Sequence, residues 1–367
     1  RRKKNFCWWK TLKSTSLFLV CSAKVVLYFE LSTIFAEKIS RKNYMKKILG
    51  VGNALVDALY KIDNENIIRE LGVSIDGMTL IDAERRKKIV ERLNNVPFEC
   101  RTGGSASNAV HCVAALGGDA SFIGRTGRDE HGKFYAKSCE QAGVKPLTTI
   151  SEDIPTGVAT TFILPDGRRT FATYLGAAAT VSAEDLHEGD FAAADYMFIE
   201  GYLVQNHGLI LRAVELAQRN GVKVCLDLAS WNIVEEERAF FAELLPKIDI
   251  VFANEEEAQA MTGTMGEAAA EWLARICPIA VVKCGAEGAV AVSGDKKVRV
   301  AAERVKQVED TTGAGDFFAG GFLYEHAQGA SLEDCLQMGA RCAAAVIQVM
   351  GTQLSAETWV ELRQNRA

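Results

Sequence analysis

The sequence predicts an α/β protein with a doubly wound, mostly parallel sheet, helices on both faces, and a small separate β-sheet. From Tyr196 onward, short apolar runs alternate with helical segments, which is typical of parallel strands joined by crossover helices. A hairpin with alternating strands at 156–164 and 169–174, around Pro165-Asp166-Gly167, interrupts this rhythm. Because the hairpin lies outside the β-α repeat, we assign it to the small sheet, which projects from the main domain.

The composition is that of a globular protein with a sizeable core. Of 367 residues, 48% are hydrophobic and 24% are charged, and the net charge is −5. No basic face stands out beyond the N-terminus and no apolar run is long enough to span a bilayer, so we expect neither a nucleic-acid nor a membrane partner. The ten cysteines form no C-x-x-C pair and no Cys/His cluster, which argues against zinc and favours a reducing, cytoplasmic compartment.

Residues 1–44 differ from the rest of the chain. A basic start and the apolar run Leu17–Phe29 resemble a signal peptide, but Lys24 interrupts the run and no small-residue cleavage site follows. Met45-Lys46-Lys47 leads directly into a strand. We therefore expect Met45 to be the initiator, and residues 1–44 to be upstream translation or a disordered extension.

In the first half, turn and cap residues separate the expected elements. These are a strand at 48–51, a helix at 83–93, a helix at 105–116 opened by Gly103-Gly104, a strand at 121–124 and a helix capped by Asp129.

The second half follows the regular alternation. Its expected elements are strands at 196–199, 222–226, 250–252 and 279–282, a β-rich stretch at 289–308, and helices at 208–219, 235–245, from Glu255, from Glu267, from Ala314 to about Gln328, and from Ser331. Ligands of such sheets bind at the carboxyl ends of the strands. Polar candidates at those ends or in the adjacent loops are Asp57, Gly103-Gly104, Asp227, Asn254 and Asp316.

The segment from Asp310 to Asp316, Asp-Thr-Thr-Gly-Ala-Gly-Asp, joins a glycine turn to a helix start. Its glycines leave backbone N–H groups uncovered, and the helix adds the positive end of its dipole, so the segment predicts a phosphate site. A carboxylate at position 316 repels phosphate, which makes sense if it takes a proton from an attacking hydroxyl. The alternative is an ordinary capped helix whose glycines serve packing.

A second set of polar residues precedes it in the chain. Asp57 follows Leu55 on the same side of an extended chain, where its carboxylate is suited to two neighbouring sugar hydroxyls; the alternative is a solvated loop charge. Gly103 and Gly104 permit close approach of a ligand to the backbone. Asn108, one turn into the following helix, offers both a donor and an acceptor.

Asn254-Glu255-Glu256-Glu257 directly follows a predicted strand. The helix dipole explains acids at a helix start, and we read Glu255 and Glu256 in that way. Glu257, together with Asn254, is the candidate to reach a hydrated Mg²⁺ or the phosphates that it carries, because Mg²⁺ keeps most of its waters in such sites.

Two nucleotide-binding fingerprints are missing. Gly50-Val51-Gly52 does not continue as G-x-G-x-x-G, because Leu55 stands at the sixth position, which argues against a nicotinamide oxidoreductase. No G-x-x-x-x-G-K-[ST] occurs, so the chain is not a P-loop protein.

In order and spacing, these motifs resemble the two signatures of the ribokinase-like (PfkB) carbohydrate kinases. The signatures are Gly103-Gly104…Asn108 and Asp310–Asp316, with Asn254-x-x-Glu257 between them, and the resemblance covers roughly Lys46 to the C-terminus. The segments that look like adenosine kinases are Gly52–Asp57, Thr173–Ala178 and Phe252–Ala258. Asp227-Leu228-Ala229-Ser230 departs from the Asn-containing segment that is usual in that branch.

The resemblance implies one kinase domain, 45–367, with a β lid over the substrate. The lid segments are about 53–62, 75–81, 97–102 and 155–175. Asp316 becomes the base for a primary hydroxyl, and the amides of Gly313, Ala314, Gly315 and Asp316 form the anion hole. The substrate side comprises Asn53, Leu55, Asp57, Gly103, Gly104 and Asn108. The ATP and Mg²⁺ side comprises Asn254, Glu257, Gly285 and Gly288, with Glu257 acting through water, and Asp310 is a further candidate that positions a monovalent cation such as K⁺.

These implications favour an ATP-dependent kinase for a small ribonucleoside or sugar, with adenosine as the leading acceptor and AMP as its product. Such a kinase is expected to work as a monomer or homodimer. Alternative acceptors are those of ribokinase, fructokinase and 2-keto-3-deoxygluconate kinase types. From other classes, a nicotinamide oxidoreductase and a non-catalytic nucleotide-binding protein remain; the latter is expected to lack the base, the anion hole or Asn254 and Glu257, and all are present.

Overall fold

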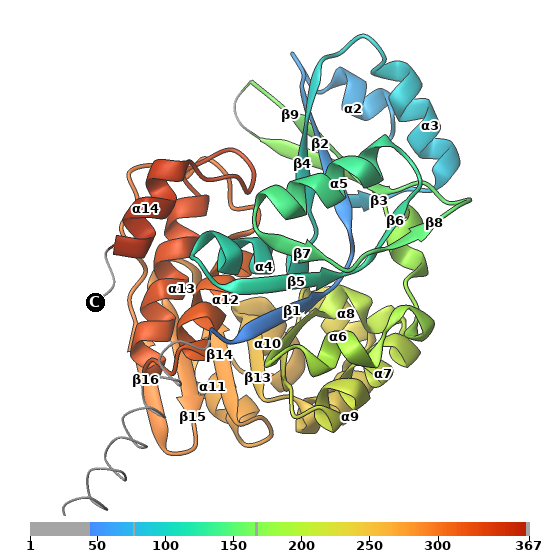
Figure 1. The fold of residues 1–367 in the computed structure, drawn as a ribbon. Coiled ribbons are helices and arrows are strands. Elements are labelled where there is room, and N and C mark those ends of the chain that lie inside the picture. The colour runs from blue at the N-terminus through green and yellow to red at the C-terminus, as the bar shows by residue number, and fades with distance from the viewer. Residues whose placement is uncertain (1–44, 76–77, 166–167, 365–367) are drawn as a thin grey trace, which may run out of the picture. The chain divides into compact units, whose positions relative to one another are not determined.

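A nine-stranded sheet forms the centre of the described chain (Figure 1). The structure is a computed structural model that describes residues 45–75, 78–165 and 168–364. The expected N-terminal extension, residues 1–44, and Asp166-Gly167 of the hairpin turn lie outside the described residues.

The strand order of this sheet is β16-β15-β14-β13-β12-β11-β1-β5-β7, and its strands from β14 to β7 pair in parallel. The two strands at the other edge, β15 and β16, are antiparallel. The strand bounds are β1 Lys47–Val51, β5 Asp119–Ile123, β7 Val144–Pro146, β11 Tyr196–Glu200, β12 Lys223–Asp227, β13 Ile250–Asn254, β14 Ile279–Lys283, β15 Ala289–Ser293 and β16 Lys296–Val300. The predicted doubly wound, mostly parallel sheet is confirmed.

Helices cover both faces because successive strand residues point to opposite sides. In β11, Met197 and Ile199 enter one buried cluster, whereas Tyr196 and Phe198 enter the other. The first cluster is closed by α6 Glu188–Ala192, α7 His207–Arg219, α8 Trp231–Glu236, α9 Arg238–Leu244, α10 Glu255–Thr262 and α11 Gly266–Ala274. The second is closed by α4 Ser105–Ala115, α5 Glu130–Gln141, α12 Ala314–Ala327, α13 Leu332–Val346 and α14 Ala356–Gln364.

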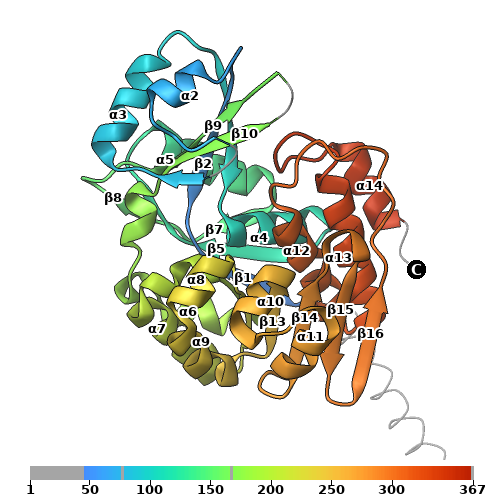
Figure 2. The same cartoon turned by 180° about the vertical axis from the view of Figure 1, so that it is seen from behind.

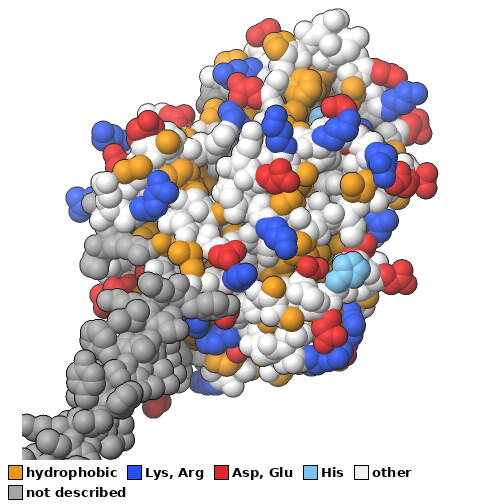
Figure 3. Space-filling model, in the orientation of Figure 1, with side chains coloured by type: hydrophobic (Ala, Val, Ile, Leu, Met, Phe, Trp, Pro, Cys, Tyr) orange, Lys and Arg blue, Asp and Glu red, His pale blue; other side chains and the backbone are white. Residues whose placement is uncertain are grey.

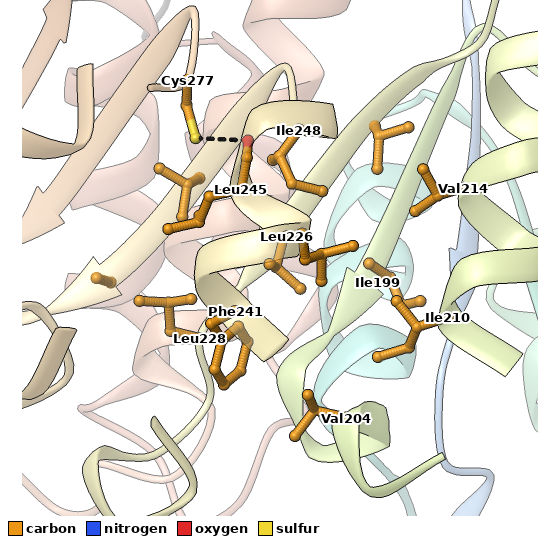
Figure 4. Close-up of a cluster of buried hydrophobic side chains, with 14 of the residues drawn as sticks. Ile199, Val204, Ile210, Val214, Leu226, Leu228, Phe241, Leu245, Ile248 and Cys277 are labelled. Atoms are coloured by element: carbon orange, nitrogen blue, oxygen red, sulfur yellow. Dashed lines mark hydrogen bonds between the residues drawn. The ribbon is translucent and has the colours of Figure 1, made fainter. Parts of the chain in front are cut away.

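Figure 4 shows part of the first cluster. Ile199 and Leu226 from neighbouring strands meet Ile210 of α7 and Phe241 of α9, and all four are fully buried. The Cys277 thiol donates to the Leu245 carbonyl at 3.2 Å, so even its polar hydrogen is satisfied inside the core.

A separate five-stranded sheet has the order β3-β10-β9-β2-β4. Its strands are β2 Leu55–Lys61, β3 Met78–Leu80, β4 Phe98–Gly103, β9 Gly157–Ile163 and β10 Arg169–Tyr174. Each of the four lid segments expected from the sequence contributes at least one strand, and β9 and β10 pair as the predicted hairpin. One face packs on α2 Asn66–Glu70 and α3 Ala83–Arg92, which Figures 1 and 2 show beside this sheet and away from α6–α11.

The remaining short elements connect the two sheets and the helices. They are β6 Arg125–Gly127 and β8 Thr149–Ser151, which pair in parallel, and the 3₁₀ turns η1 Gly176–Thr180, η2 Ala183–Asp185, η3 Gly201–Gln205, η4 Leu245–Lys247 and η5 Gly285–Glu287.

Two secondary-structure predictions were wrong. The β-rich stretch ends with β16 at Val300, because the charged residues that follow, among them Glu303 and Arg304, are exposed and offer no apolar face to a sheet. The helix expected at 235–245 is two helices, α8 and α9, because the backbone leaves the helical region at Glu237.

The surface carries charges of both signs. On the face shown in Figure 3, basic and acidic side chains are interspersed without a patch of one sign. None of the helices in the described part of the chain has the length and hydropathy of a membrane span.

Gly104, the N-cap of α4, is where the chain returns from the small sheet. Its φ is +98°, and a Cβ placed on it would lie 2.1 Å from the carbonyl oxygen of Asn53. Gly117, beyond the other end of α4, has φ +100° with nothing within 4 Å of such an atom. Both glycines therefore adopt a backbone conformation that would strain any other residue, but they differ in the space available to a Cβ.

We predict that Gly104→Ala lowers the free energy of unfolding by about 1–3 kcal/mol more than Gly117→Ala, because only Gly104→Ala adds an overlap to the strained φ. Urea unfolding of both variants measures the difference. Equal losses of unfolding free energy in the two variants would contradict the close contact between Gly104 and the Asn53 carbonyl.

Candidate active site

Four adjacent strands of the large sheet each end in a polar side chain. Glu200, Asp227, Asn254 and Lys283 are the last residues of β11, β12, β13 and β14. The sheet register sets Glu200 opposite Asp227 and Asn254 opposite Lys283. A line of charged and amide groups therefore follows the carboxyl edge, where parallel sheets bind ligands.

Asp316 lies in the first turn of α12. Its carboxylate accepts hydrogen bonds from Ser105 Oγ at 2.6 Å and Asn108 Nδ2 at 2.9 Å, both from the start of α4. Burial raises the pKa of Asp316 despite these two bonds, and the charge of Asp227 raises it further while Lys283 lowers it. The carboxylate is therefore fixed in direction and more basic than an exposed aspartate.

The predicted anion hole is partly free. The amide of Ala314 donates to the Thr311 carbonyl at 3.2 Å, whereas the amides of Gly315 and Asp316 make no backbone hydrogen bond to the residues preceding the helix within the described chain. A Cβ on Gly315 would lie 3.0 Å from Lys283 Nζ, so glycine lets this ammonium approach the helix start. Amide dipoles and a cation converge here, and both attract an anion.

Lys283 was not among the residues predicted from the sequence. Its ammonium pairs with Asp227 at 2.7 Å, and the two side chains are 14% and 6% exposed. Burial lowers the pKa of Lys283, but the charges of Asp227 and Glu257 outweigh burial and raise it overall, so Lys283 stays cationic. The sequence signal was a single lysine that ends an apolar strand.

Asn254 and Glu257 form a reciprocal capping box at the start of α10. Asn254 Oδ1 accepts from the Glu257 amide at 2.8 Å, and Glu257 accepts from the Asn254 amide at 2.8 Å and from its side chain at 2.7 Å. Burial and the charge of Asp227 raise the pKa of Glu257 to about 7, although Lys283 and the Asn254 amide act against them.

The donor set decides how a divalent metal can fit. Within the described residues, no group of three His, Cys, Asp or Glu side chains could hold a metal ion directly. Both Glu257 oxygens already accept one hydrogen bond each. The arrangement fits a metal that arrives with phosphate and keeps its waters, with Glu257 accepting from those waters.

Arg169 and Asp310 both lie close enough to Asp57 to shift its pKa. Burial raises the pKa of Asp57 to about 7, Arg169 lowers it, and Asp310 and Asp316 raise it. Arg169 of β10 pairs with Asp310, which also accepts from the amides of Gly351 at 2.8 Å and Thr312 at 3.0 Å. The Asp310 carboxylate, which we predicted to position a monovalent cation, therefore already accepts hydrogen bonds from these three donors.

Asn53, where the chain leaves the large sheet, lies against Gly104, where the chain returns from the small sheet into α4. Asn53 donates its backbone and side-chain N–H groups to the buried Glu200, which also accepts from the Ala106 amide of α4. Burial raises the pKa of Glu200 to about 7 against these bonds. Leu55 begins β2 opposite Gly103.

Gly285 and Gly288 shape the turn after β14. The Gly288 carbonyl accepts from the Cys284 amide at 2.7 Å, and the Gly288 amide donates to Gly285 at 3.2 Å. Both glycines have positive φ. The turn follows directly on Lys283, beside the proposed phosphate end.

The structure thus brings the predicted residues together in two groups. Asp316, Asn108, Gly104 and Asn53 surround the start of α4, while Asn254 and Glu257 flank the Asp227–Lys283 pair. Sequence reasoning missed four functional candidates: Ser105, Arg169, Glu200 and Lys283. A charge at the end of an apolar strand was the available signal for Glu200 and Lys283.

Comparison with known proteins matches residues 71–359 to the pfkB family carbohydrate kinase description. A probable sugar kinase from Rhizobium etli CFN 42 superposes with a TM-score of 0.79 at 35% identity, covering 87% of this chain and 98% of its own. The adenosine kinase from Sinorhizobium meliloti gives a TM-score of 0.79 at 34% identity over 88% and 99%. Ribokinase from Mus musculus is 30% identical over 287 residues, which is 74% of this chain and 86% of that protein.

These likenesses confirm the ribokinase-like fold and the kinase class predicted from the sequence, and they set aside the oxidoreductase alternative. Kinases of this family use ATP with a divalent metal and act on small sugars or nucleosides. The chain belongs to the PfkB family of carbohydrate kinases.

Proposed function

We propose that this kinase transfers the γ-phosphoryl group of ATP to the primary hydroxyl of a ribonucleoside, and that the nucleoside is adenosine. The observation that carries the proposal is the Asp316 carboxylate, fixed by Ser105 and Asn108 beside the free amides of Gly315 and Asp316. A base and an anion site within one helical turn suit a hydroxyl that attacks a phosphate.

In the proposed reaction, Asp316 accepts the proton of the substrate hydroxyl as its oxygen forms a bond to the γ-phosphorus. The bond from that phosphorus to the β–γ bridging oxygen breaks in line, and ADP leaves with the electron pair. The amides at the start of α12 stabilise charge on the transferred group, and Lys283 is placed to do the same.

The metal requirement follows from charge. Three carboxyl groups, Asp227, Glu257 and Asp316, lie around Lys283, so a triphosphate bound beside them would need additional positive charge. Asn254 and Glu257 would hold the water shell of a bound Mg²⁺, and the ion would supply that charge and neutralise the phosphates.

The small sheet is the proposed lid. Asp57 on β2 is suited to bind the ribose hydroxyls, and the Arg169–Asp310 pair ties β10 to the loop that precedes α12. Closing this sheet over the acceptor would exclude water and suppress hydrolysis of ATP. The free cysteines in the described chain support a reducing compartment, so we place the reaction in the cytoplasm.

Adenosine is preferred over a free sugar because three segments, Gly52–Asp57, Thr173–Ala178 and Phe252–Ala258, resemble adenosine kinases. The solved structures do not separate the two acceptor classes, because the Sinorhizobium meliloti adenosine kinase matches 88% of this chain and the Rhizobium etli sugar kinase 87%. Sugar acceptors remain the second candidate, because the Rhizobium etli sugar kinase matches equally well.

We predict that Asp316→Asn lowers kcat on the order of 10²–10⁴-fold without unfolding the protein, because the amide cannot accept the hydroxyl proton. Steady-state kinetics and thermal melting measure the two effects. Asp334→Asn is a matched control, since Asp334 also lies in the first turn of a helix, α13, away from the site. Near-wild-type turnover of Asp316→Asn would reject Asp316 as the base.

The charge of Lys283 should set the pH dependence. Asp316 must be ionised to act, so activity is lost as pH falls through its pKa, and Lys283 lowers that pKa. We predict that Lys283→Met moves the acid limb of kcat/KM to higher pH, while Lys283→Arg leaves it near the wild-type position. A pH–rate profile of the three proteins measures this shift. Coincident acid limbs would contradict the electrostatic role.

The acceptor can be identified by a coupled ADP-release screen of adenosine, inosine, ribose, fructose and 2-keto-3-deoxygluconate. We predict the highest kcat/KM for adenosine, with AMP as the product. A higher value for any free sugar would overturn the nucleoside assignment and leave the kinase class intact.

A further inference from the structure

Glu200 is a buried carboxylate with no cation beside it. It is the last residue of β11, is 1% exposed, and forms no ion pair with any described residue. Its hydrogen-bond partners are all N–H groups: Oε1 accepts from the Asn53 amide at 2.9 Å and from Asn53 Nδ2 at 2.5 Å, and Oε2 accepts from the Ala106 amide at 2.8 Å. A buried acid without a cation is rare and costly, so its position calls for a reason.

The partners of Glu200 lie at the two ends of the segment from β2 to β4, which contributes three strands to the small sheet. Asn53 lies between β1 of the large sheet and β2 of the small sheet, and Ala106 follows β4 as the chain returns into α4. The chain packs tightly against Glu200 here: a Cβ placed on Gly52 would lie only 2.5 Å from Glu200 Oε2. One carboxylate therefore holds both the outgoing and the returning segment against β11.

The same contact fixes the orientation of the Asn53 amide. An ionised carboxylate only accepts hydrogen bonds, so the Asn53 NH₂ group must face Glu200 and Oδ1 must face away. Asn53 Oδ1 accepts no hydrogen bond from any described residue, and this oxygen is not fully buried. It is thus left as an acceptor on a residue that the resemblance to adenosine kinases assigns to the substrate side.

We propose that Glu200 is a positioning residue for the acceptor substrate: it presents Asn53 Oδ1 to a donor group of the nucleoside and keeps the Asn53 and Gly104 segments in register. This inference rests on the proposed assignment of Asn53 to the acceptor site. Glu200 shares no hydrogen bond with Asn254 or Glu257, which lie on the proposed ATP side.

The test compares two carboxylates that flank the same strand. Glu200→Gln keeps the size of the side chain but turns an NH₂ group toward one of its N–H partners. Asp195 precedes β11 and accepts from the Lys47 amide at 2.9 Å, so it ties β11 to the other end of β1. Asp195→Asn is therefore the matched control for a purely structural loss.

With the acceptor found in the screen, we expect Glu200→Gln to raise the acceptor KM about 10- to 100-fold, as the loss of one to two buried hydrogen bonds predicts. The KM for ATP should stay within about twofold, and Asp195→Asn should change neither constant by more than that. An unchanged acceptor KM in Glu200→Gln, or an equal rise in both constants, would overturn the proposal. A wild-type chain that phosphorylates no nucleoside refutes the proposed function instead.

A second variant keeps the test decisive if Glu200→Gln folds poorly. Asn53→Ala removes the acceptor atom directly and should raise the acceptor KM by itself. In the double variant, the two effects should not add, since Glu200 acts through Asn53. Additive effects, or an Asn53→Ala variant with wild-type acceptor KM, would refute positioning through Asn53.

Discussion

Two hydrogen bonds to the Asp316 carboxylate, from Ser105 Oγ and Asn108 Nδ2, join the first turn of α12 to the first turn of α4. The bodies of both helices are buried in one core cluster with α13, so their starts cannot move apart without disturbing that core. Each helix start contributes unpaired amides and the positive end of a dipole. The fold thereby concentrates positive potential at one place on the sheet edge, and the carboxylates Asp316 and Glu200 are the protein's own anions there.

The buried carboxyl groups of the site outnumber the lysine and arginine side chains that pair with acids there. Burial raises the pKa of Asp57, Glu200 and Glu257 to about 7 each, and that of Asp316 above its usual value. Two like charges 4 Å apart repel by roughly 4 kcal/mol at the effective dielectric constant near a protein surface, so such a cluster is unfavourable by itself. Lys283 and Arg169 offset part of this cost, and a divalent metal entering with ATP would offset more. The electrostatic conflict is therefore consistent with a site that is completed by its substrates.

Local patterns were enough to predict much of the fold. Apolar runs located β1 and β11 to β14. Glycine and capping signals located α4 and α13, acidic residues at a helix start located α10, and the glycine segment before α12 pointed to an anion site next to Asp316. The patterns failed beyond Val300 and at Glu237, where the deciding factors were exposure and a local backbone break. Glu200 and Lys283 could not be assigned, because a charge at a strand end has the same sequence signal whether it is solvated or functional. Their roles depend on partners far away in the chain: Glu200 meets Asn53 across 147 positions, and Lys283 meets Asp227 across 56.

If the Asp316 carboxylate receives the proton of the acceptor's primary hydroxyl, a crystal structure with adenosine, Mg²⁺ and a non-hydrolysable ATP analogue will show the two groups in contact. We expect the primary hydroxyl oxygen within about 2.6–3.2 Å of an Asp316 carboxylate oxygen, with the γ-phosphate on the amides of Gly315 and Asp316. A primary hydroxyl bound away from Asp316, with another side chain as its hydrogen-bond acceptor, would contradict this role of Asp316.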